Sequence, residues 1–350
     1  MSADTIHVGL VGGGGISSTH ARAALALPGV SIAAIQGVND AKVRALCARH
    51  GGTAYAGIDA FLAHRPMDLV AIGSPSGLHA AHGIAAARQG LHVLVEKPID
   101  ITTAGADALI EAAEQANVRL GVFFQDRFKP GIGALKELLE EGRLGTPLLV
   151  DARVPWYRPP EYFSGSKWRA SLTLDGGGAL INQAIHTLDL LLWLLGDVVR
   201  VQAHTATLLH KIEAEDSGAA ILEFATGALG VFSFTTAAYP GYPRRVAITG
   251  SRGTATIEQD TLVSVDVQGD DEANAPAPAF RPLAALPDAR SSSPIIDDVS
   301  AHTAVFEDFI AAIRDSRPPR CDGSEGRRSV ALVEAIYRAS GTRQAVNLRG

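Results

Sequence analysis

A lysine stands directly after an apolar stretch whose pattern is typical of a buried strand. The stretch Leu91-His-Val-Leu-Val-Glu96 leads into Lys97 and Pro98. Open α/β sheets bind their ligands outside the carboxyl ends of the strands, and Pro98 favours an extended backbone at the residue before it. A lysine at such a strand end can donate a hydrogen bond to a substrate oxygen and stabilise negative charge that develops there.

A second polar group interrupts an apolar helix. Three glycines, Gly176 to Gly178, lead into a segment in which Asn182, His186, Asp189 and Trp193 recur at helical spacing on one face. Histidine has the unperturbed pKa closest to neutrality, so His186 is suited to act as a general base. Asn182 is expected to orient the substrate and not to exchange protons. The alternative role of His186 is that of a hydrogen-bonded core residue, and the glycines and Asn182 favour the base.

The two groups together predict hydride transfer. Oxidation of a secondary alcohol needs a base for the hydroxyl proton while hydride leaves the carbon, and His186 and Lys97 offer a base and a stabiliser of alkoxide charge. A surface lysine in a salt bridge is the alternative reading of Lys97. Hydride transfer also needs a cofactor that carries the hydride, such as a nicotinamide.

The first residues have the order of a dinucleotide-binding domain. A strand over Ile6-His-Val-Gly-Leu-Val11 is followed by Gly12-Gly-Gly-Gly-Ile16 and then by a helix from about Ser18 to Leu27. If Gly12 and Gly14 are the first two glycines of a G-x-G-x-x-G fingerprint, Ser17 takes the third position and is small enough for close packing. The pyrophosphate of the cofactor is then expected at Gly12, Gly14, Gly15 and Ile16.

The second strand, Val30 to Ile35, lacks the usual acidic residue at its end. In NAD-binding domains this residue holds the ribose 2′-hydroxyl, and here its position falls on Gly37. A 2′-phosphate would meet no repulsion at Gly37 and could contact Asn39, Lys42 or Arg44, so we expect NADP in preference to NAD. NAD is the alternative if Asp40 takes the place of that acidic residue.

The rest of the first half continues the alternation of strands and helices. We expect strands at 68–72 and 119–124, a helix at 103–116, and an N-terminal Rossmann domain with a doubly wound parallel sheet over residues 1–124. His79 and His82 lie three residues apart, but no carboxylate or thiol stands near them in the sequence, so no metal site is expected. Further expected cofactor contacts are Ser74, Pro75, His79, Glu96 and Lys97.

Residues 125–350 predict an α+β domain. Its alternating segments favour a large, open, mostly antiparallel sheet with one covered face, and two amphipathic helices near 301–315 and 326–340 are expected to pack back against the first domain. Residues 268–300, rich in Pro, Ala, Asp and Ser, indicate an irregular excursion. The expected strands lie at 148–154, 198–202, 217–224, 228–234 and 246–249.

Composition excludes several function classes. The 350 residues, 47% hydrophobic and 19% charged, suit a globular protein of two domains. A net charge of −6 without a basic patch argues against nucleic acid as a partner. No apolar run is long enough to span a membrane and the N-terminus lacks the features of a secretory signal. The two cysteines, Cys47 and Cys321, are read as small buried residues, and a cytoplasmic location is expected.

At this point the chain resembles the Gfo/Idh/MocA oxidoreductases, almost from end to end. The shared landmarks are Gly12 and Gly14 with His20, Ser74-Pro75 with His79, Glu96-Lys97-Pro98, Arg127-Phe128 with Pro130, and Gly178 through His186 to Asp189. The resemblance implies a Rossmann domain followed by a domain with an open mixed sheet. The outer face of that sheet would form a homodimer or homotetramer.

Within this family the chain looks most like members that oxidise C3 of UDP-N-acetylglucosamine or of its uronic acid. The likeness rests on 156–162, 167–169, 174–186 and Ala237-Ala-Tyr-Pro-Gly241. Those members use NAD and keep an acid at the second strand, so Gly37 departs from their pattern, while Asn182 replaces an aspartate common in the wider family. The implied substrate is a sugar or sugar nucleotide. Its expected contacts are Arg127, Tyr157, Arg158, Trp168, Arg169, Asn182 and His186.

Each of these arginines and aromatic residues has a structural alternative. Arginine can grip a carboxylate or phosphate with two hydrogen bonds and aromatic faces suit sugar rings, but salt bridges and core packing use the same residues. Two other functions stay open: a dehydrogenase or reductase of a free pyranose, inositol or glycoside, and a non-catalytic NAD(P)-binding sensor. The presence of both Lys97 and His186 argues against the sensor.

Overall fold

The computed structural model describes residues 5–166, 168–269 and 298–348, which form two compact units. Within the described residues, unit 1 contains 5–125, 173–176 and 298–331, and unit 2 contains the others. The division differs from the single boundary expected after residue 124, because two later segments group with the first unit. The long helix α10 (Gly323–Thr342) contributes residues to both units.

Unit 1 is built on a parallel sheet. Its six strands have the order β3-β2-β1-β4-β5-β6, which is the order of a doubly wound dinucleotide-binding fold. The inner strands are almost fully buried, which explains their continuous apolar runs. The strands are β1 (Ile6–Val11), β2 (Val30–Gln36), β3 (Thr53–Tyr55), β4 (Leu69–Ile72), β5 (His92–Glu96) and β6 (Leu120–Phe123).

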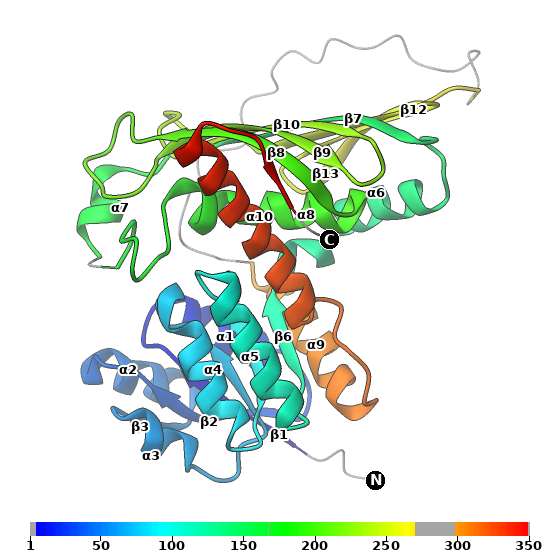
Figure 1. The fold of residues 1–350 in the computed structure, drawn as a ribbon. Helices are drawn as coiled ribbons and strands as arrows, with labels where there is room; N and C mark the ends of the chain where they lie inside the picture. Colours follow the sequence, from blue (N-terminus) through cyan, green and yellow to red (C-terminus); the bar gives the residue numbers. More distant parts are fainter. Residues whose placement is uncertain (1–4, 167, 270–297, 349–350) are drawn as a thin grey trace. The chain divides into compact units, whose positions relative to one another are not determined.

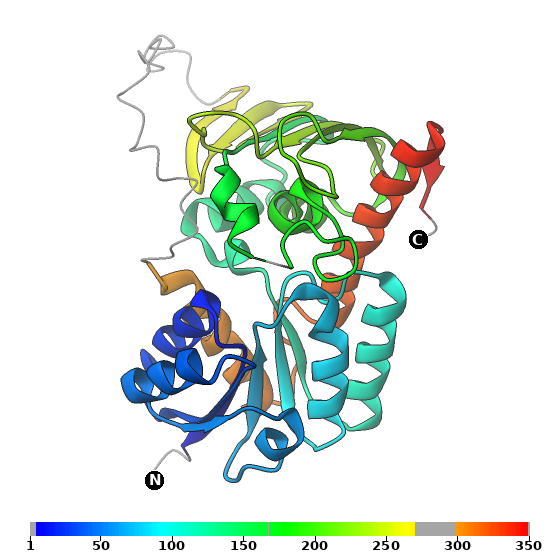
Figure 2. The same ribbon diagram turned by 90° about the vertical axis from the view of Figure 1, so that its left-hand side faces the viewer.

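Helices cover both faces of this sheet. In Figure 2 the blue helices α1 and α2 lie on one side of it, and the cyan and green α4 and α5 lie on the other. Helix α9 packs beside α1, as expected for one of the last helices. The helices of unit 1 are α1 (Gly15–Leu25), α2 (Asp40–His50), α3 (Ile58–Leu62), η1 (Ser76–Leu78), α4 (His79–Ala87), α5 (Thr103–Gln115) and α9 (Ser300–Arg314).

Unit 2 is built on an eight-stranded sheet with the order β13-β12-β11-β7-β10-β9-β8-β14. The pair β7 and β10 is parallel and the other neighbouring pairs are antiparallel, so the sheet is mixed, as expected. The strands are β7 (Pro147–Pro155), β8 (Val198–Ala206), β9 (Ser217–Phe224), β10 (Leu229–Thr235), β11 (Arg245–Gly250), β12 (Gly253–Glu258), β13 (Thr261–Val267) and β14 (Val346–Asn347).

One face of the second sheet packs on helices (Figure 1). Side chains alternate along β10, where Phe232 and Phe234 are buried while Leu229 and Val231 are half exposed. The helices that contact this sheet include α6 (Pro130–Glu140), the π-helix η3 (Ala179–Ala184) and α8 (Ile185–Leu195). Two short helical segments complete the unit, η2 (Gln125–Phe128) at its start and α7 (Pro160–Ser164).

Several boundaries differ from those expected from the sequence. Helix α1 starts at Gly15 and not near Ser18. Its N-cap is Gly14, which has no side chain to cap the helix. Strands β12 to β14 were not expected as separate elements. Most of the irregular segment expected at 268–300 lies outside the described residues. Within the described part of the chain, no helix is both long and apolar enough to cross a membrane.

Candidate active site

The glycine turn after β1 is shaped by close backbone contacts. Gly12 has a φ of +124°, and a Cβ atom there would lie 2.6 Å from the carbonyl oxygen of Gly73. The same Cβ would lie 2.9 Å from the hydroxyl of the buried Ser17, which fills the third position of the fingerprint. Gly12 is therefore required by the turn, and Ser17 is tolerated because it is small.

The start of α1 suits an anionic group. Its N-cap, Gly14, provides no side-chain hydrogen bond, and the first turn holds no acidic residue. A Cβ on Gly14 or Gly15 would meet nothing within 4 Å, so the backbone there can be approached closely. Amide groups at a helix N-terminus together with the helix dipole favour a phosphate. Gly14, Gly15 and Ile16 would thus hold the pyrophosphate of a dinucleotide.

Gly37 lies against the same turn. A Cβ there would stand 3.0 Å from the backbone nitrogen of Gly13 and 3.0 Å from the side chain of Val43. Any side chain at position 37, an acidic one included, would therefore be crowded by Gly13 and Val43. Asn39 caps α2, with its side-chain oxygen accepting a hydrogen bond from the amide of Lys42, and Asp40 pairs with Arg44.

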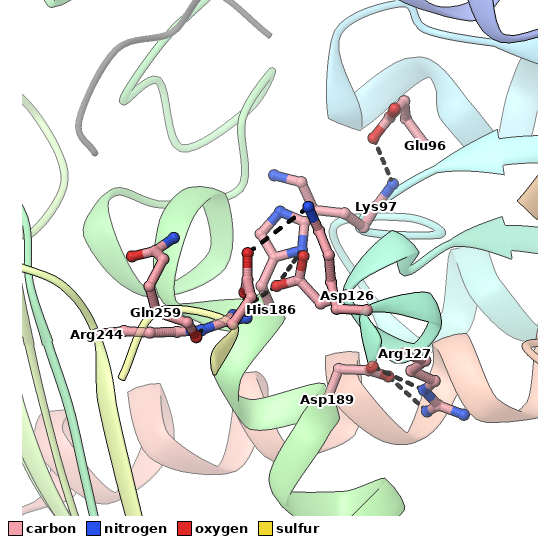
Figure 3. Close-up of polar contacts among 10 residues, drawn as sticks. Glu96, Lys97, Asp126, Arg127, His186, Asp189, Arg244 and Gln259 are labelled. Atoms are coloured by element: carbon pink, nitrogen blue, oxygen red, sulfur yellow. Dashed lines mark hydrogen bonds and ion pairs between the residues drawn. The ribbon is translucent and has the colours of Figure 1, made fainter. Parts of the chain in front are cut away.

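A buried ion pair fixes the backbone that carries Lys97. His20 Nε2 donates to Glu96 Oε1 at 2.9 Å, and the amide of Lys97 donates to Glu96 Oε2 at 3.2 Å. Burial acts to raise the pKa of Glu96, but the hydrogen bond and charge of His20, with smaller effects of His302 and Lys97, hold this pKa at about 2. The carboxylate stays ionised at neutral pH, so Lys97 leaves β5 from an anchored strand end (Figure 3).

His79, an expected cofactor contact, is buried between two loops. Its side chain is 1% exposed, and its ring nitrogens lie 2.7 Å from the carbonyl oxygen of Pro98 and 2.9 Å from that of Ser74. Burial lowers the pKa of this imidazole. The ring therefore ties together the loops that follow β4 and β5, whereas the sequence suggested a polar group offered to the cofactor.

His82, on α4, contacts the loop that follows β4. His82 Nδ1 lies 3.0 Å from the hydroxyl of Ser74. Within the described part of the chain, no cluster of His, Cys, Asp and Glu is arranged to hold a metal ion.

In unit 2, the segment of Asn182 and His186 is not one regular helix. It begins as the π-helix η3 and continues as α8 from Ile185, so Asn182 lies on the wider turn and His186 on the regular one. The side-chain amide of Gln183 donates to Asn182 Oδ1 at 2.7 Å, which fixes the orientation of Asn182. The even helical spacing expected for Asn182 and His186 is thus broken by the π-turn.

Asp126 is the acidic neighbour of His186 (Figure 3). Its Oδ2 atom lies 4.0 Å from His186 Nδ1 and accepts a hydrogen bond of 2.5 Å from Arg244 Nη1. Burial acts to raise the pKa of Asp126, but the charges of Arg244 and His186 and the hydrogen bond from Arg244 hold this pKa at about 2. Neither Asp126 nor Arg244 was expected from the sequence, because no local motif links residues so far apart.

Arg127, an expected substrate contact, lies in a buried ion pair. Its side chain is 1% exposed and forms two hydrogen bonds to Asp189, of 2.8 and 2.6 Å. Asp189 is itself fully buried. This salt bridge joins η2 to α8, on the residue of its polar face that follows His186 in the sequence.

The other expected substrate residues gather around Tyr162. The guanidinium of Arg169 lies 4.0 Å from the centre of the Tyr162 ring and that of Arg158 lies 5.3 Å from it. Arg158 also donates to Gln183 Oε1 at 2.7 Å. Burial, together with the charge of Arg169, lowers the pKa of Arg158. Trp168 lies beside Arg169, whereas Tyr157 packs edge-to-face on Tyr239.

Comparison with known proteins identifies the family. The model described as the oxidoreductase family with an NAD-binding Rossmann fold matches residues 6–124, and the model of the GFO/IDH/MocA C-terminal domain matches residues 132–256. The chain belongs to the Gfo/Idh/MocA oxidoreductase family. Unit 1 is accordingly an NAD-binding Rossmann domain, and the resemblance found in the sequence is confirmed.

Relatives within the family span the whole chain. The crystal structure of the WlbA dehydrogenase from Bordetella pertussis, in complex with NADH and UDP-GlcNAcA, is 31% identical with a TM-score of 0.88, over 100% of this chain and 99% of that one. Inositol 2-dehydrogenase of Rhizobium meliloti is 27% identical over 98% of this chain and 99% of its own length. D-apiose dehydrogenase of Paraburkholderia graminis is 26% identical, over 97% and 89%. The protein is an oxidoreductase related to sugar and polyol dehydrogenases.

The family's glycine-rich entry into η3 has a structural reason in this member. A Cβ on Gly177 would lie 2.1 Å from the hydroxyl of Tyr337, and one on Gly178 would lie 1.9 Å from the carbonyl oxygen of Glu215. Glu215 accepts hydrogen bonds from the amides of Gly178 and Leu180 and from the hydroxyl of Tyr337, of 3.1, 2.8 and 3.0 Å. The buried Glu215 therefore braces the start of the π-helix that carries Asn182.

Replacing Glu215 with glutamine should destabilise the protein and misplace Asn182. The amide would present a donor to one of the backbone N–H groups, and an unsatisfied buried donor costs about 1–3 kcal/mol, which lowers Tm by roughly 1–4 °C in a chain of this size. Calorimetry of the variant measures this. Tyr337→Phe is the matched control, since it removes one bond and leaves both amides satisfied, so its Tm should fall less. Equal losses of Tm in the two variants would contradict the bracing role.

Proposed function

We propose that the protein transfers hydride between a nicotinamide and a ring secondary alcohol or ketone of a sugar or sugar nucleotide, with C3 favoured. The observation that carries the proposal is the presence of two chemically suited groups, each beside an ionised carboxylate. Lys97 follows a strand end anchored by Glu96, and His186 lies beside Asp126. In this proposal Lys97 and His186 act on the same hydroxyl group.

The proposed roles follow from the side chains. His186 Nδ1 faces Asp126, so Nε2 is assigned the hydroxyl proton during oxidation. The Lys97 ammonium donates to the same oxygen and stabilises its developing charge. Asn182, oriented by Gln183, offers its side chain to a substrate hydroxyl. The nicotinamide, when bound, accepts or returns the hydride.

A sugar nucleotide is favoured over a free sugar by the two arginines around Tyr162. The Arg169 Nε atom is buried and donates to no acceptor among the described residues. The guanidinium groups of Arg158 and Arg169 both lie near the ring of Tyr162. Such cations can bind a carboxylate or a phosphate. The likeness to WlbA, solved with UDP-GlcNAcA, supports this substrate class. A free polyol or pyranose is the second candidate, supported by the likeness to inositol 2-dehydrogenase.

For the cofactor, we propose NADP in preference to NAD. Gly37 presents no carboxylate, and the adjoining start of α2 exposes Lys42, which could contact a 2′-phosphate. Two features favour NAD: Asp40 near the same turn, and the NADH bound in WlbA. The packing of Gly37 on Gly13 applies equally to both cofactors.

We also propose that the protein forms a homodimer or homotetramer through the second sheet. Large apolar side chains on its strands are about half exposed, an arrangement typical of an interaction surface. They are Leu148, Leu149, Ile221, Leu229, Val231, Val263 and Val265.

Native mass spectrometry of the purified protein tests these proposals together. We titrate it with NAD, NADP, UDP-N-acetylglucosamine, its uronic acid and myo-inositol, and expect an oligomer that binds one nicotinamide dinucleotide per chain, with NADP preferred. Binding of a UDP-sugar but not of inositol is expected in the ternary complex. Preference for NAD would overturn the cofactor proposal, and inositol binding without UDP-sugar binding would favour the second candidate.

A further inference from the structure

Asp126 occupies an unusual place for a buried carboxylate. It lies in η2, close in the sequence to β6, and is 14% exposed in its side chain while its Oδ2 faces both His186 and Arg244. At 4.0 Å, the distance to His186 Nδ1 is too long for a hydrogen bond and short enough for a strong effect of charge. Asp126 therefore acts on His186 through its field and not through a shared proton.

Arg244 holds this carboxylate in place from the other side. It is 1% exposed, donates to Asp126 and to the backbone oxygen of Gln259, and pairs with Asp260. Gln259 has a φ of +53°, which brings the turn between β12 and β13 back onto Arg244. The guanidinium is thus fixed by partners on two sides, and it in turn fixes Asp126.

The charges of the cluster behind Asp126 balance. Asp126 and Asp260 are matched by Arg244 and by Lys129, whose ammonium lies 3.7 Å from Asp260. Lys129 also lowers the pKa of Asp126 by its charge. When His186 accepts a proton, the new positive charge lies beside the carboxylate of Asp126, whereas Asn182 carries no charge.

We propose that Asp126, locked by Arg244, is a positioning residue that stabilises the protonated state of His186. This inference rests on the proposed function of His186 as the base. Asp126 provides the negative charge beside the imidazolium that the uncharged Asn182 does not. The cluster of Asp126, Arg244 and Asp260 thus has a role beyond holding η2 to the second sheet.

The test measures the titration of the His186 ring itself. The pH dependence of its NMR signal is recorded in the holoenzyme with labelled histidine, for the wild type, Asp126→Asn and Asp260→Asn. The signal is assigned by its loss in His186→Gln. In Asp126→Asn the midpoint should move to lower pH by about 0.5–1 unit, because a nearby anion favours the protonated ring. Asp260→Asn, which keeps the Arg244 to Asp126 bond, should move it by less than half as much.

Kinetics give a second readout once a substrate is known. In Asp126→Asn, kcat should fall about tenfold with KM within about twofold, and the acidic limb of its pH profile should move in the same direction as the NMR midpoint. Asp126→Glu keeps the charge, so it should retain the wild-type midpoint and covers the case in which Asp126→Asn does not fold. An unchanged midpoint in Asp126→Asn, or an equal shift in Asp260→Asn, would overturn the proposal. Because the titration needs no turnover, this result is separate from a failure of the proposed function.

Discussion

Replacing Lys97 with alanine should lower kcat by about 10²–10³-fold, the usual loss on removing one preorganised donor to a developing oxyanion. The binding of the nicotinamide dinucleotide should change by less than about threefold, because its pyrophosphate is expected at the glycine turn and at the start of α1. The effect is expected to be large because Glu96 fixes the amide of Lys97, so the ammonium starts from an anchored backbone. Steady-state kinetics and a cofactor titration measure the two quantities.

Lys211→Ala is the control for this variant, because Lys211 is exposed in a turn of unit 2. It should leave kcat within about twofold, as is usual for surface positions. If Lys97→Ala kept more than about a third of the wild-type kcat, Lys97 would be a surface lysine without a catalytic role. Loss of cofactor binding along with turnover would instead assign Lys97 to the cofactor site.

Replacing His186 with glutamine should lower kcat for alcohol oxidation by about 10²–10⁴-fold, since a positioned general base contributes about that much. The residual rate should no longer rise through the pH range in which histidine loses its proton. In the wild type, the acidic limb of the kcat profile reports the base in its neutral form. Rate measurements across pH on both proteins test this.

His204→Gln is the matched control, because His204 lies exposed on β8. This variant should keep both the rate and the pH profile. An acidic limb that survives in His186→Gln would show that another group accepts the proton.

The elements formed by residues close together in the sequence could be predicted. The contacts in the site between residues far apart in the sequence could not. The strand, glycine turn and helix at the N-terminus follow from short-range rules, and Gly12 is required by a contact with Gly73. Glu96 and Lys97 were readable because one strand end carries both. The pairing of Glu96 with His20 spans 76 residues and has no local signature.

The same limit explains the errors in unit 2. The sequence could not show that Arg127 would pair with Asp189, so a buried salt bridge was taken as a possible substrate contact. The π-turn at Asn182 also escaped, because the apolar pattern of Ala179 to Leu195 fits a regular helix. Asp126 and Arg244 lie 118 residues apart. They meet because Arg244, just before β11, bonds to Asp126 of η2, a contact that only the tertiary structure shows.

Transfer of a labelled hydride tests the central proposal most directly. The wild-type holoenzyme is incubated with oxidised NADP or NAD and the uronic acid of UDP-N-acetylglucosamine that carries deuterium at C3, and the cofactor is analysed by mass spectrometry. The account predicts deuterium in the reduced nicotinamide together with a 3-keto sugar nucleotide, and formation of both products about 10²–10³-fold more slowly with Lys97→Ala. A bound cofactor that gains no deuterium from this substrate, and no hydride from unlabelled sugars or inositol, would contradict the assignment of a sugar dehydrogenase.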